Sequence, residues 1–226
     1  MAAAKNSNRD GSSAKSVQDR LLDAAEELFC ERGFDDTGVR DIAAAAGCNI
    51  ASVNYYFRGK DNLYLEVWRR RLVLMRQTRL ASIDEIMSRE DPPPRLEDLL
   101  RSYAYAFVQP MANENMGRQF IKLMAREMID PHLSENVLYE ELIKPTVPAL
   151  HKALVKTCPG LDESKTLLMI LSIVGQLMHA LHTKGFFEQT HGHGKKLFEY
   201  SLTDAVEHIV KFSAAGIRAY TKEQDK

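Results

Sequence analysis

The chain has 226 residues, which is the length of one large domain or of two smaller ones. Hydrophobic residues make up 45% and charged residues 27% of the sequence, a balance that excludes collagen-like and wholly disordered chains. The net charge of −1 comes from 30 basic and 31 acidic residues and argues against coating nucleic acid or an anionic membrane by bulk charge alone.

The sequence predicts a cytoplasmic protein without a membrane partner. No apolar run approaches the roughly 20 residues that span a bilayer, and the polar N-terminus lacks the apolar centre of a signal peptide. Cys30, Cys48 and Cys158 are too few and too scattered for a disulfide framework or a paired-cysteine zinc site, and they suit a reducing compartment.

The first quarter of the chain predicts three helices. Residues 1–15 have no periodic apolar positions and are expected to form a disordered arm. A first helix is predicted over 16–33, where apolar residues recur at helical spacing before a glycine. A short helix should follow Thr37, whose hydroxyl can cap it, and a third should cover 49–57. Two short helices around a glycine turn, at about 38–57, have helix-turn-helix spacing.

The rest of the chain predicts long amphipathic helices and no strands, so the predicted fold class is all-α. The three prolines at 92–94 should end the first of these helices, and Pro110, Pro131 and Pro159 should separate later ones. The predicted ranges are 60–87, 95–110, 116–129, 134–157, 162–186 and 197–220.

Charge is distributed unevenly along the chain. Residues 38–79 contain eight basic and three acidic side chains, whereas residues 80–226 contain 17 basic and 20 acidic ones. A basic segment that includes a short helix pair is what phosphate binding requires, because each neutralised phosphate releases condensed counterions.

The third predicted helix has residue types that suit a DNA groove. Asn can pair with adenine, Ser with base edges or phosphate, and Ala with a thymine methyl group. Residues at helix ends could hold phosphates and so set the register on the duplex. The same side chains would also suit the solvated surface of a small helical bundle. The base-facing candidates are Ile50, Ala51, Ser52, Asn54 and Tyr55, and the phosphate candidates are Thr37, Arg40, Tyr56 and Lys60.

Three segments together resemble the DNA-binding domain of TetR/AcrR-type bacterial transcriptional regulators. They are DTGVRDIA at 36–43, AGCN at 46–49 and SVNYYFRGKDNL at 52–63, within a resemblance that covers about 14–75. Eight positions match DNA contacts of the family: Thr37, Arg40, Ile50, Ala51, Ser52, Asn54, Tyr56 and Lys60. The predicted interface consists of these eight together with Asn49 and Tyr55. Asn54 stands where many members have Tyr, which affects the base preference.

This resemblance implies a two-domain homodimer, with a DNA-binding domain at 16–75 and a C-terminal regulatory and dimerisation domain at 76–226. The segment FIKLMAREM at 120–128, followed by Asp130 and Pro131, resembles the CecR-like branch of the family. The implied partners are double-stranded operator DNA and a small-molecule inducer. The implied function is a repressor that the inducer releases from a palindromic operator and that joins the nucleoid when bound to DNA. No cofactor is predicted.

A set of aromatic and sulfur-containing side chains could line the inducer cavity, since ligand pockets are mainly apolar with a few oriented polar groups. A methionine-rich helical core would have the same composition. The apolar candidates are Tyr103, Phe107, Phe120, Met124, Met128, Tyr139 and Met178, and the polar candidates are Arg126 and Glu127.

Two other groups of residues have both a functional and a structural interpretation. Cys48 lies beside a helix N-terminus, which favours a reactive thiolate, but such a residue is more often a small buried hydrophobe. His179, His182, His191 and His193, with Glu188, could bind a metal, but we interpret them as polar loop and interface residues and predict no metal site.

The last two predicted helices are apolar enough either to form a core or to pair with their copies across a two-fold axis, and we favour the dimer. A helical enzyme, or an adaptor that uses the same C-terminal pocket for a protein partner, is the alternative. The sequence contains no Gly-x-Ser-x-Gly elbow, phosphate loop or His-Glu-x-x-His motif, so we predict that the chain is not an enzyme.

Overall fold

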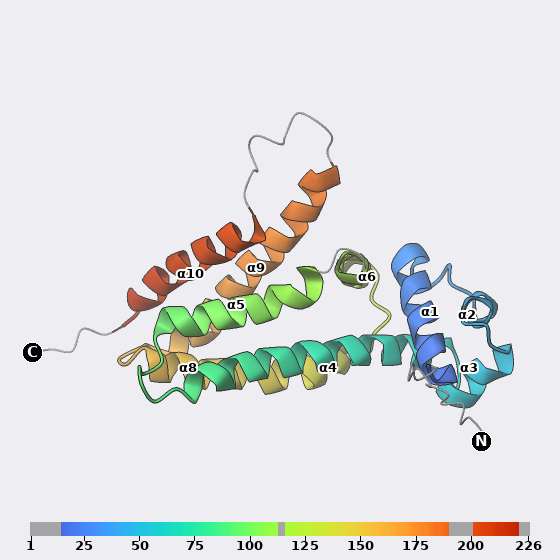
Figure 1. The fold of residues 1–226 in the computed structure, drawn as a ribbon, viewed down its shortest axis with the longest axis horizontal. Helices are drawn as coiled ribbons and strands as arrows, with labels where there is room; N and C mark the ends of the chain where they lie inside the picture. The colour runs from blue at the N-terminus through green and yellow to red at the C-terminus, as the bar shows by residue number, and fades with distance from the viewer. Residues whose placement is uncertain (1–14, 113–115, 190–200, 222–226) are drawn as a thin grey trace, which may run out of the picture. The chain divides into compact units, whose positions relative to one another are not determined.

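The computed structural model describes residues 15–112, 116–189 and 201–221. Within these ranges all regular elements are helical, as predicted, and they belong to two compact units (Figure 1). The N-terminal unit is Met1–Val67 and the C-terminal unit is Trp68–Lys226, so the chain passes from one to the other inside α4 (Lys60–Met87). The predicted domain boundary at residue 75 lies further along the same helix. Most of the predicted arm lies outside the described residues.

Three helices and the start of α4 form the N-terminal unit: α1 (Val17–Arg32), α2 (Val39–Ala45) and α3 (Ile50–Phe57). The α1 helix begins where the Ser16 hydroxyl accepts a hydrogen bond from the Asp19 amide at 3.1 Å. It ends at Gly33, whose φ of 91° lies in the region that favours glycine. The unit is filled by Phe29, which packs edge to face on Tyr64 with ring centroids 4.9 Å apart.

The turn between α2 and α3 depends on two residues. Gly47 has a φ of 60°, which side-chain-bearing residues adopt at a cost of about 1–2 kcal/mol. Asn49 caps α3, and its Oδ1 accepts a hydrogen bond from the Ala51 amide at 2.9 Å. The predicted third helix is confirmed, and the Asn49 cap fixes where it begins.

The C-terminal unit contains the larger core. Fully buried leucines and Phe107 fill the space between its helices, and α10 lies beside both α9 and α5 (Figure 1). Its elements after α4 are α5 (Leu96–Ala112), α6 (Met116–Ile129), α7 (Glu135–Leu138), the π-helix η1 (Tyr139–Ile143), α8 (Lys144–Thr157), the 3₁₀ turn η2 (Glu163–Lys165), α9 (Thr166–Gln189) and α10 (Leu202–Arg218).

Two predicted boundaries are wrong. Pro110 does not end its helix, because α5 continues to Ala112: a proline near the C-terminus removes one backbone hydrogen bond, and packing tolerates that loss. The single helix predicted over 134–157 is interrupted by the π-helical turn η1. One extra residue in a turn changes the apolar spacing too little to be visible in the sequence.

Two ion pairs fasten α10 to α5. Arg101 holds both carboxylate oxygens of Glu207, at 2.7 and 2.9 Å, and Arg218 lies 2.6 Å from Glu97. The hydrogen bond from Arg101 lowers the pKa of Glu207. Burial tends to raise the pKa of Glu97, but the hydrogen bond from Arg218 and backbone contacts lower it overall. Ionised carboxylates are therefore part of how α10 docks.

This arrangement predicts that acid loosens α10. Because folding lowers the pKa of Glu207, its contribution to stability is complete above the ordinary glutamate pKa of about 4.3 and disappears as the pH falls through the folded-state pKa. At pH 7 we expect Glu207→Gln to cost about 1 kcal/mol and a few degrees in unfolding midpoint. The difference from wild type should begin to shrink below about pH 4.3 and vanish once the pH lies below the folded-state pKa of Glu207. Glu140→Gln removes an exposed pair with Lys144 and is the control. A difference that persists in acid would contradict this prediction.

Candidate nucleic-acid interface and regulatory core

The outer face of α3 presents the residues that sequence analysis selected. Val53 and Phe57 are buried and fix the helix to its unit, while Ala51 and Asn54 are exposed. Ile50 is 43% and Tyr55 is 81% exposed, which is unusual for side chains of this size in a short helix. An exposed face with small, polar and aromatic groups, held rigidly by two buried anchors, can make directional contacts with a partner.

Most of the predicted phosphate candidates surround this face. Tyr56 is 42% exposed, and its ring packs edge-on against that of Tyr55 at 5.0 Å. Arg40 is exposed on α2, and Ser52 is half-buried on α3. Asn49 is exposed but already uses its Oδ1 to cap α3, so its amide nitrogen is the group available to a partner.

Thr37 is a correction to the predicted interface. Its side chain is fully buried, and its hydroxyl donates to the Gly33 carbonyl at 2.6 Å and reaches the Leu28 carbonyl at 3.2 Å. The N-cap of α2 is Gly38, without a side-chain hydrogen bond, so Thr37 does not cap that helix either. Because its hydroxyl satisfies the carbonyls at the end of α1, Thr37 cannot offer it to a phosphate.

We expect Thr37→Val to lower the free energy of unfolding of the N-terminal unit by about 1–2 kcal/mol, because the substitution removes the side-chain donor of the Gly33 carbonyl. Nucleic-acid affinity measured well below the unfolding midpoint should stay within twofold of wild type. Chemical denaturation followed by circular dichroism and a binding titration check the two halves. A large affinity loss in a fully folded variant would return Thr37 to the interface.

Lys60, the first residue of α4, has partners inside its own unit. Its Nζ lies 4.3 Å from the centroid of the Phe34 ring and donates to the Asp35 carbonyl at 3.3 Å. These contacts hold the ammonium group at the end of a helix without neutralising it, because neither partner is an anion. A positive charge that is partly exposed and held in place suits a phosphate.

The basic residues between 38 and 79 are divided between the two units. Five of the eight basic residues in this segment belong to the C-terminal unit, including three that are buried or pair with a carboxylate. Arg69 and Arg76 bind Glu141 of η1 at 3.1 and 2.8 Å, and Arg79 is buried. Residues 38–67 contain three basic and three acidic side chains, so local geometry, and not net charge, supports nucleic-acid binding. Glu141 was missed, because a pair 65 residues apart leaves no periodic trace.

Cys48 is half-buried, and its Sγ donates to the Ala46 carbonyl at 3.3 Å. Cys30 and Cys158 are buried, and burial raises the pKa of the Cys158 thiol. None of these three cysteines is joined in a disulfide, and the burial of Cys30 and Cys158 is typical of cysteine packed as a small hydrophobe.

Three of the predicted ligand residues lie in the core of the C-terminal unit. Tyr103, Phe107 and Phe120 are buried, and Phe120 packs against Trp68 with ring centroids 5.3 Å apart. Burial raises the pKa of Tyr103, although the nearby charge of Arg79 opposes the shift. Burial in turn lowers the pKa of Arg79. This cluster combines aromatic surface with two buried polar groups.

Four other candidates do not join the cluster. Met128 is 80% and Tyr139 50% exposed, because the helical stripe of α6 ends before Met128 and Tyr139 begins the π-helical turn. Arg126 is exposed. Glu127 accepts hydrogen bonds from the amides of His132 and Leu133 at 2.7 and 2.5 Å, so its carboxylate stabilises the turn after α6.

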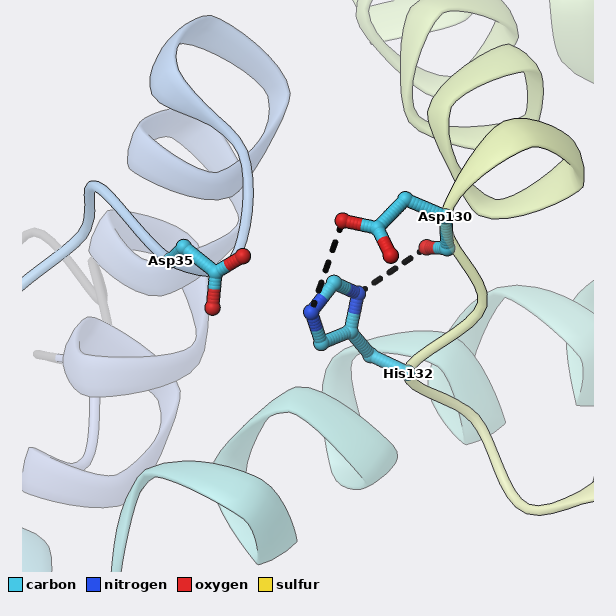
Figure 2. A group of neighbouring side chains, drawn as sticks. All are labelled: Asp35, Asp130 and His132. Atoms are coloured by element: carbon cyan, nitrogen blue, oxygen red, sulfur yellow. Dashed lines mark hydrogen bonds and ion pairs between the residues drawn. The ribbon is translucent and has the colours of Figure 1, made fainter.

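In the turn after α6, the His132 ring lies close to Asp130 (Figure 2). His132 Nε2 lies 3.9 Å from a carboxylate oxygen of Asp130, and its Nδ1 lies 2.9 Å from the Asp130 carbonyl. Asp35, which is also labelled in Figure 2, belongs to the N-terminal unit. The contacts between His132 and Asp130 lie in the same turn that the Glu127 carboxylate stabilises.

Met124 and Met178 are half-buried, and neither lines the cavity between α9 and α10. This cavity has a volume of about 880 Å³, and His179, His208 and Phe212 contribute to its wall. His179 also contacts the Thr183 hydroxyl at 3.2 Å, and His182 Nδ1 lies 2.8 Å from the Met178 carbonyl, so both α9 histidines have partners within their own helix. His191 and His193 lie outside the described residues, as does the side chain of Glu188.

One face of α9 and α10 is apolar and open. Leu167, Leu168 and Leu171 are each more than half exposed, and Phe212 is 63% exposed. Residues 163–183 contain a window with a mean hydropathy of 1.4, of which 39% is buried, so by length and composition alone this stretch is long and apolar enough to cross a membrane. Polar residues such as Ser172 and Gln176 interrupt the stretch and concealed its average hydropathy. The core helix of a soluble protein meets the same criterion.

Both units of the chain are similar to known proteins. Residues 21–67 match the family described as "Bacterial regulatory proteins, tetR family". Residues 96–217, more than half of the chain, match "HTH-type transcriptional dual regulator CecR, C-terminal domain". The chain is 44% identical over 48 residues to the "Probable HTH-type transcriptional regulator YttP" of Bacillus subtilis, a match covering 21% of the chain and 23% of YttP.

Longer matches cover both units. The chain is 26% identical over 165 residues to the "HTH-type transcriptional dual regulator CecR" of Shigella flexneri, which covers 70% of the chain and 73% of CecR. The structure of a TetR-family transcriptional regulator from Mesorhizobium loti has a TM-score of 0.64 at 15% identity, over 91% of this chain and 97% of the other, and shows the same fold.

A short helix pair with an exposed second helix, joined to a larger helical unit, defines a helix-turn-helix DNA-binding transcriptional regulator. The matches make the class specific. The chain belongs to the tetR family and has a C-terminal domain of the CecR type, so it is a transcriptional regulator and not an enzyme.

Proposed function

We propose that the chain is a ligand-responsive repressor that binds a palindromic operator as a homodimer in the cytoplasm and joins the nucleoid when bound. The observation that supports this most is the exposed face of α3, where Asn54 and Tyr55 stand free above buried Val53. A helix with small and polar outward residues fits the major groove, which is about 12 Å wide.

Base recognition in this proposal belongs to Ala51, Ser52 and Asn54, while Arg40, Tyr56 and Lys60 hold phosphates and fix the register. Ile50 and Tyr55 contribute apolar contact beside them. The assignment follows from exposure and chemistry: the α3 residues carry short donors, acceptors and a methyl group, and the flanking residues carry longer groups that can reach the backbone.

The open face of α9 and α10 is the proposed dimer interface. Burial against its copy would remove Leu167, Leu171 and Phe212 from water, and an isologous contact uses the same patch twice. The two α3 helices would then reach two half-sites about one helical turn apart, near 34 Å. In this arrangement the second copy of the chain, and not a membrane, covers the apolar side chains of residues 163–183.

The regulatory step needs a ligand with different affinity for two states of the dimer, because a ligand that binds both states equally shifts nothing. The buried aromatic cluster of α4, α5 and α6 is the proposed sensing region, since its polar groups are already inside the unit. Inducer binding there would favour the state that fits the operator less well.

A gel-shift titration with the DNA upstream of the chain's own gene tests the proposal. We expect a shift that survives excess random DNA, that weakens as salt rises, and that corresponds to two protein chains per site. Binding of equal strength to random and upstream DNA would contradict sequence-specific regulation. A failure to bind any DNA would favour a protein partner for the α3 face.

A further inference from the structure

The buried face of α4 contains one residue that does not fit its surroundings. Side chains at helical spacing along this face are apolar and almost completely buried, and the set is Trp68, Leu72, Met75, Ile83 and Ile86. Arg79 occupies the intervening position and is only 5% exposed. This spacing predicts an apolar side chain, and arginine is almost never fully buried without a partner.

Arg79 has an aromatic neighbour but no anion. Its guanidinium carbon lies 4.0 Å from the centroid of the Phe107 ring. Its Nε is buried and forms no hydrogen bond, and among the residues that the structure describes no carboxylate pairs with this side chain. Tyr103, also on α5, interacts with it electrostatically, and the buried Ser82 hydroxyl donates to the Arg79 backbone carbonyl at 2.7 Å and not to an anion.

The physical balance favours an anion at this position. A guanidinium group remains protonated in proteins, so Arg79 cannot lose its charge to suit the core. A cation–π contact offsets only part of the free energy of hydration that the guanidinium loses on burial, because the aromatic ring carries no net charge. A group that supplies a full negative charge, and hydrogen-bond acceptors for the planar guanidinium, would complete the site.

We propose that Arg79 is the anion-binding residue of the sensing region, and that the effectors of this regulator are small carboxylic acids with an apolar body. The planar guanidinium matches a carboxylate in two parallel hydrogen bonds. Tyr103, which interacts electrostatically with Arg79, offers its hydroxyl as a second donor, and the Phe107 ring, whose centroid lies 6.4 Å from that of Tyr103, provides an apolar wall. The inference rests on the proposed ligand-responsive function and adds the chemical class of the ligand.

Matched acids and amides test this class directly in the full-length protein. The probes are octanoate with octanamide and 3-phenylpropionate with 3-phenylpropanamide, with affinity measured by calorimetry and unfolding midpoint by scanning fluorimetry. We expect at least one acid to raise the midpoint of the wild type while its amide does not. Arg79→Met should weaken binding of that acid by roughly 10- to 100-fold, because it removes charge-assisted hydrogen bonds.

Three variants separate recognition from folding. Arg79→Met fills the same space with an apolar side chain, so in the absence of ligand we expect it to unfold at the same temperature as wild type or higher. Arg79→Lys keeps the charge without the planar fork and should bind the acid with intermediate affinity. Arg89→Met removes an exposed arginine and is the matched control, with unchanged binding.

The proposal is overturned if neither acid shifts the wild-type midpoint, if acid and amide act equally, or if Arg79→Met responds as the wild type does. None of these readouts involves DNA. Failure of the upstream DNA to bind would therefore contradict the proposed function, while the acid titrations would decide the role of Arg79 on their own.

Discussion

We expect Phe212→Glu to elute as the 25.6 kDa chain, at half the mass of the wild-type dimer. Phe212 is 63% exposed on the apolar face that α10 shares with α9. In a two-fold interface the new carboxylate enters twice, and an unpaired buried charge costs roughly 3–5 kcal/mol. Dimer affinity should therefore fall at least a thousandfold. Operator affinity should fall roughly a hundredfold or more, since each monomer holds a single half-site.

Size-exclusion chromatography with light scattering measures the first effect and a gel-shift titration the second. Leu74→Glu is the matched control, because Leu74 is 47% exposed but lies on α4, away from the α9 and α10 face. It should remain dimeric. A Phe212→Glu variant that stays a dimer would show that this face is covered by something other than a second copy of the chain.

The second large effect is expected at α3. A good bidentate base contact is worth about 1–3 kcal/mol, and a symmetric operator meets Asn54 twice, so Asn54→Ala should weaken operator binding by roughly 30-fold to 10⁴-fold. Binding to random DNA should change little. Lys60→Ala should instead weaken binding to every sequence and reduce the salt slope by about 2, since one phosphate contact is lost in each half of the dimer.

Competition titrations against operator and random DNA at several salt concentrations distinguish the two roles. Asn136→Ala, an exposed asparagine on α7 in the C-terminal unit, is the control and should leave both affinities unchanged. If Asn54→Ala and Lys60→Ala weaken operator and random DNA by the same factor, the division between base-reading and phosphate-holding residues is incorrect.

Local interactions explain why the sequence predicts the N-terminal unit so well. Ser16, Gly33 and Asn49 act within three or four residues of themselves, so the ends of α1 and α3 follow from residue type and spacing. The all-α class follows from the same periodicity. The predictions fail at Pro110 and in η1. At Pro110 the packing of α5 tolerates one missing backbone hydrogen bond, and in η1 the packing tolerates one additional residue in the helical turn.

The candidate site is less predictable than the fold, because the sequence shows the type of each residue but not whether its side chain faces the solvent or the core. Thr37 was expected at the surface and is buried, since its hydroxyl matches two carbonyls at the end of α1. Arg69 and Arg76 belong to the basic segment at 38–79 that the sequence assigns to phosphate binding, but they bind Glu141, which is distant in sequence. Arg79 could have been found, because it falls four residues after Met75 in an apolar stripe.

The π-helical turn η1 has a consequence for how the family varies in length. A chain one residue shorter between Tyr139 and Ile143 can close this turn as an ordinary α-helix, so the buried side chains on either side, such as Val137 and Leu150, keep their directions. The same deletion inside α8 would rotate every later side chain by about 100°. Evolutionary insertions and deletions in this region should therefore concentrate at the π turn, and an alignment gap there leaves the core unchanged.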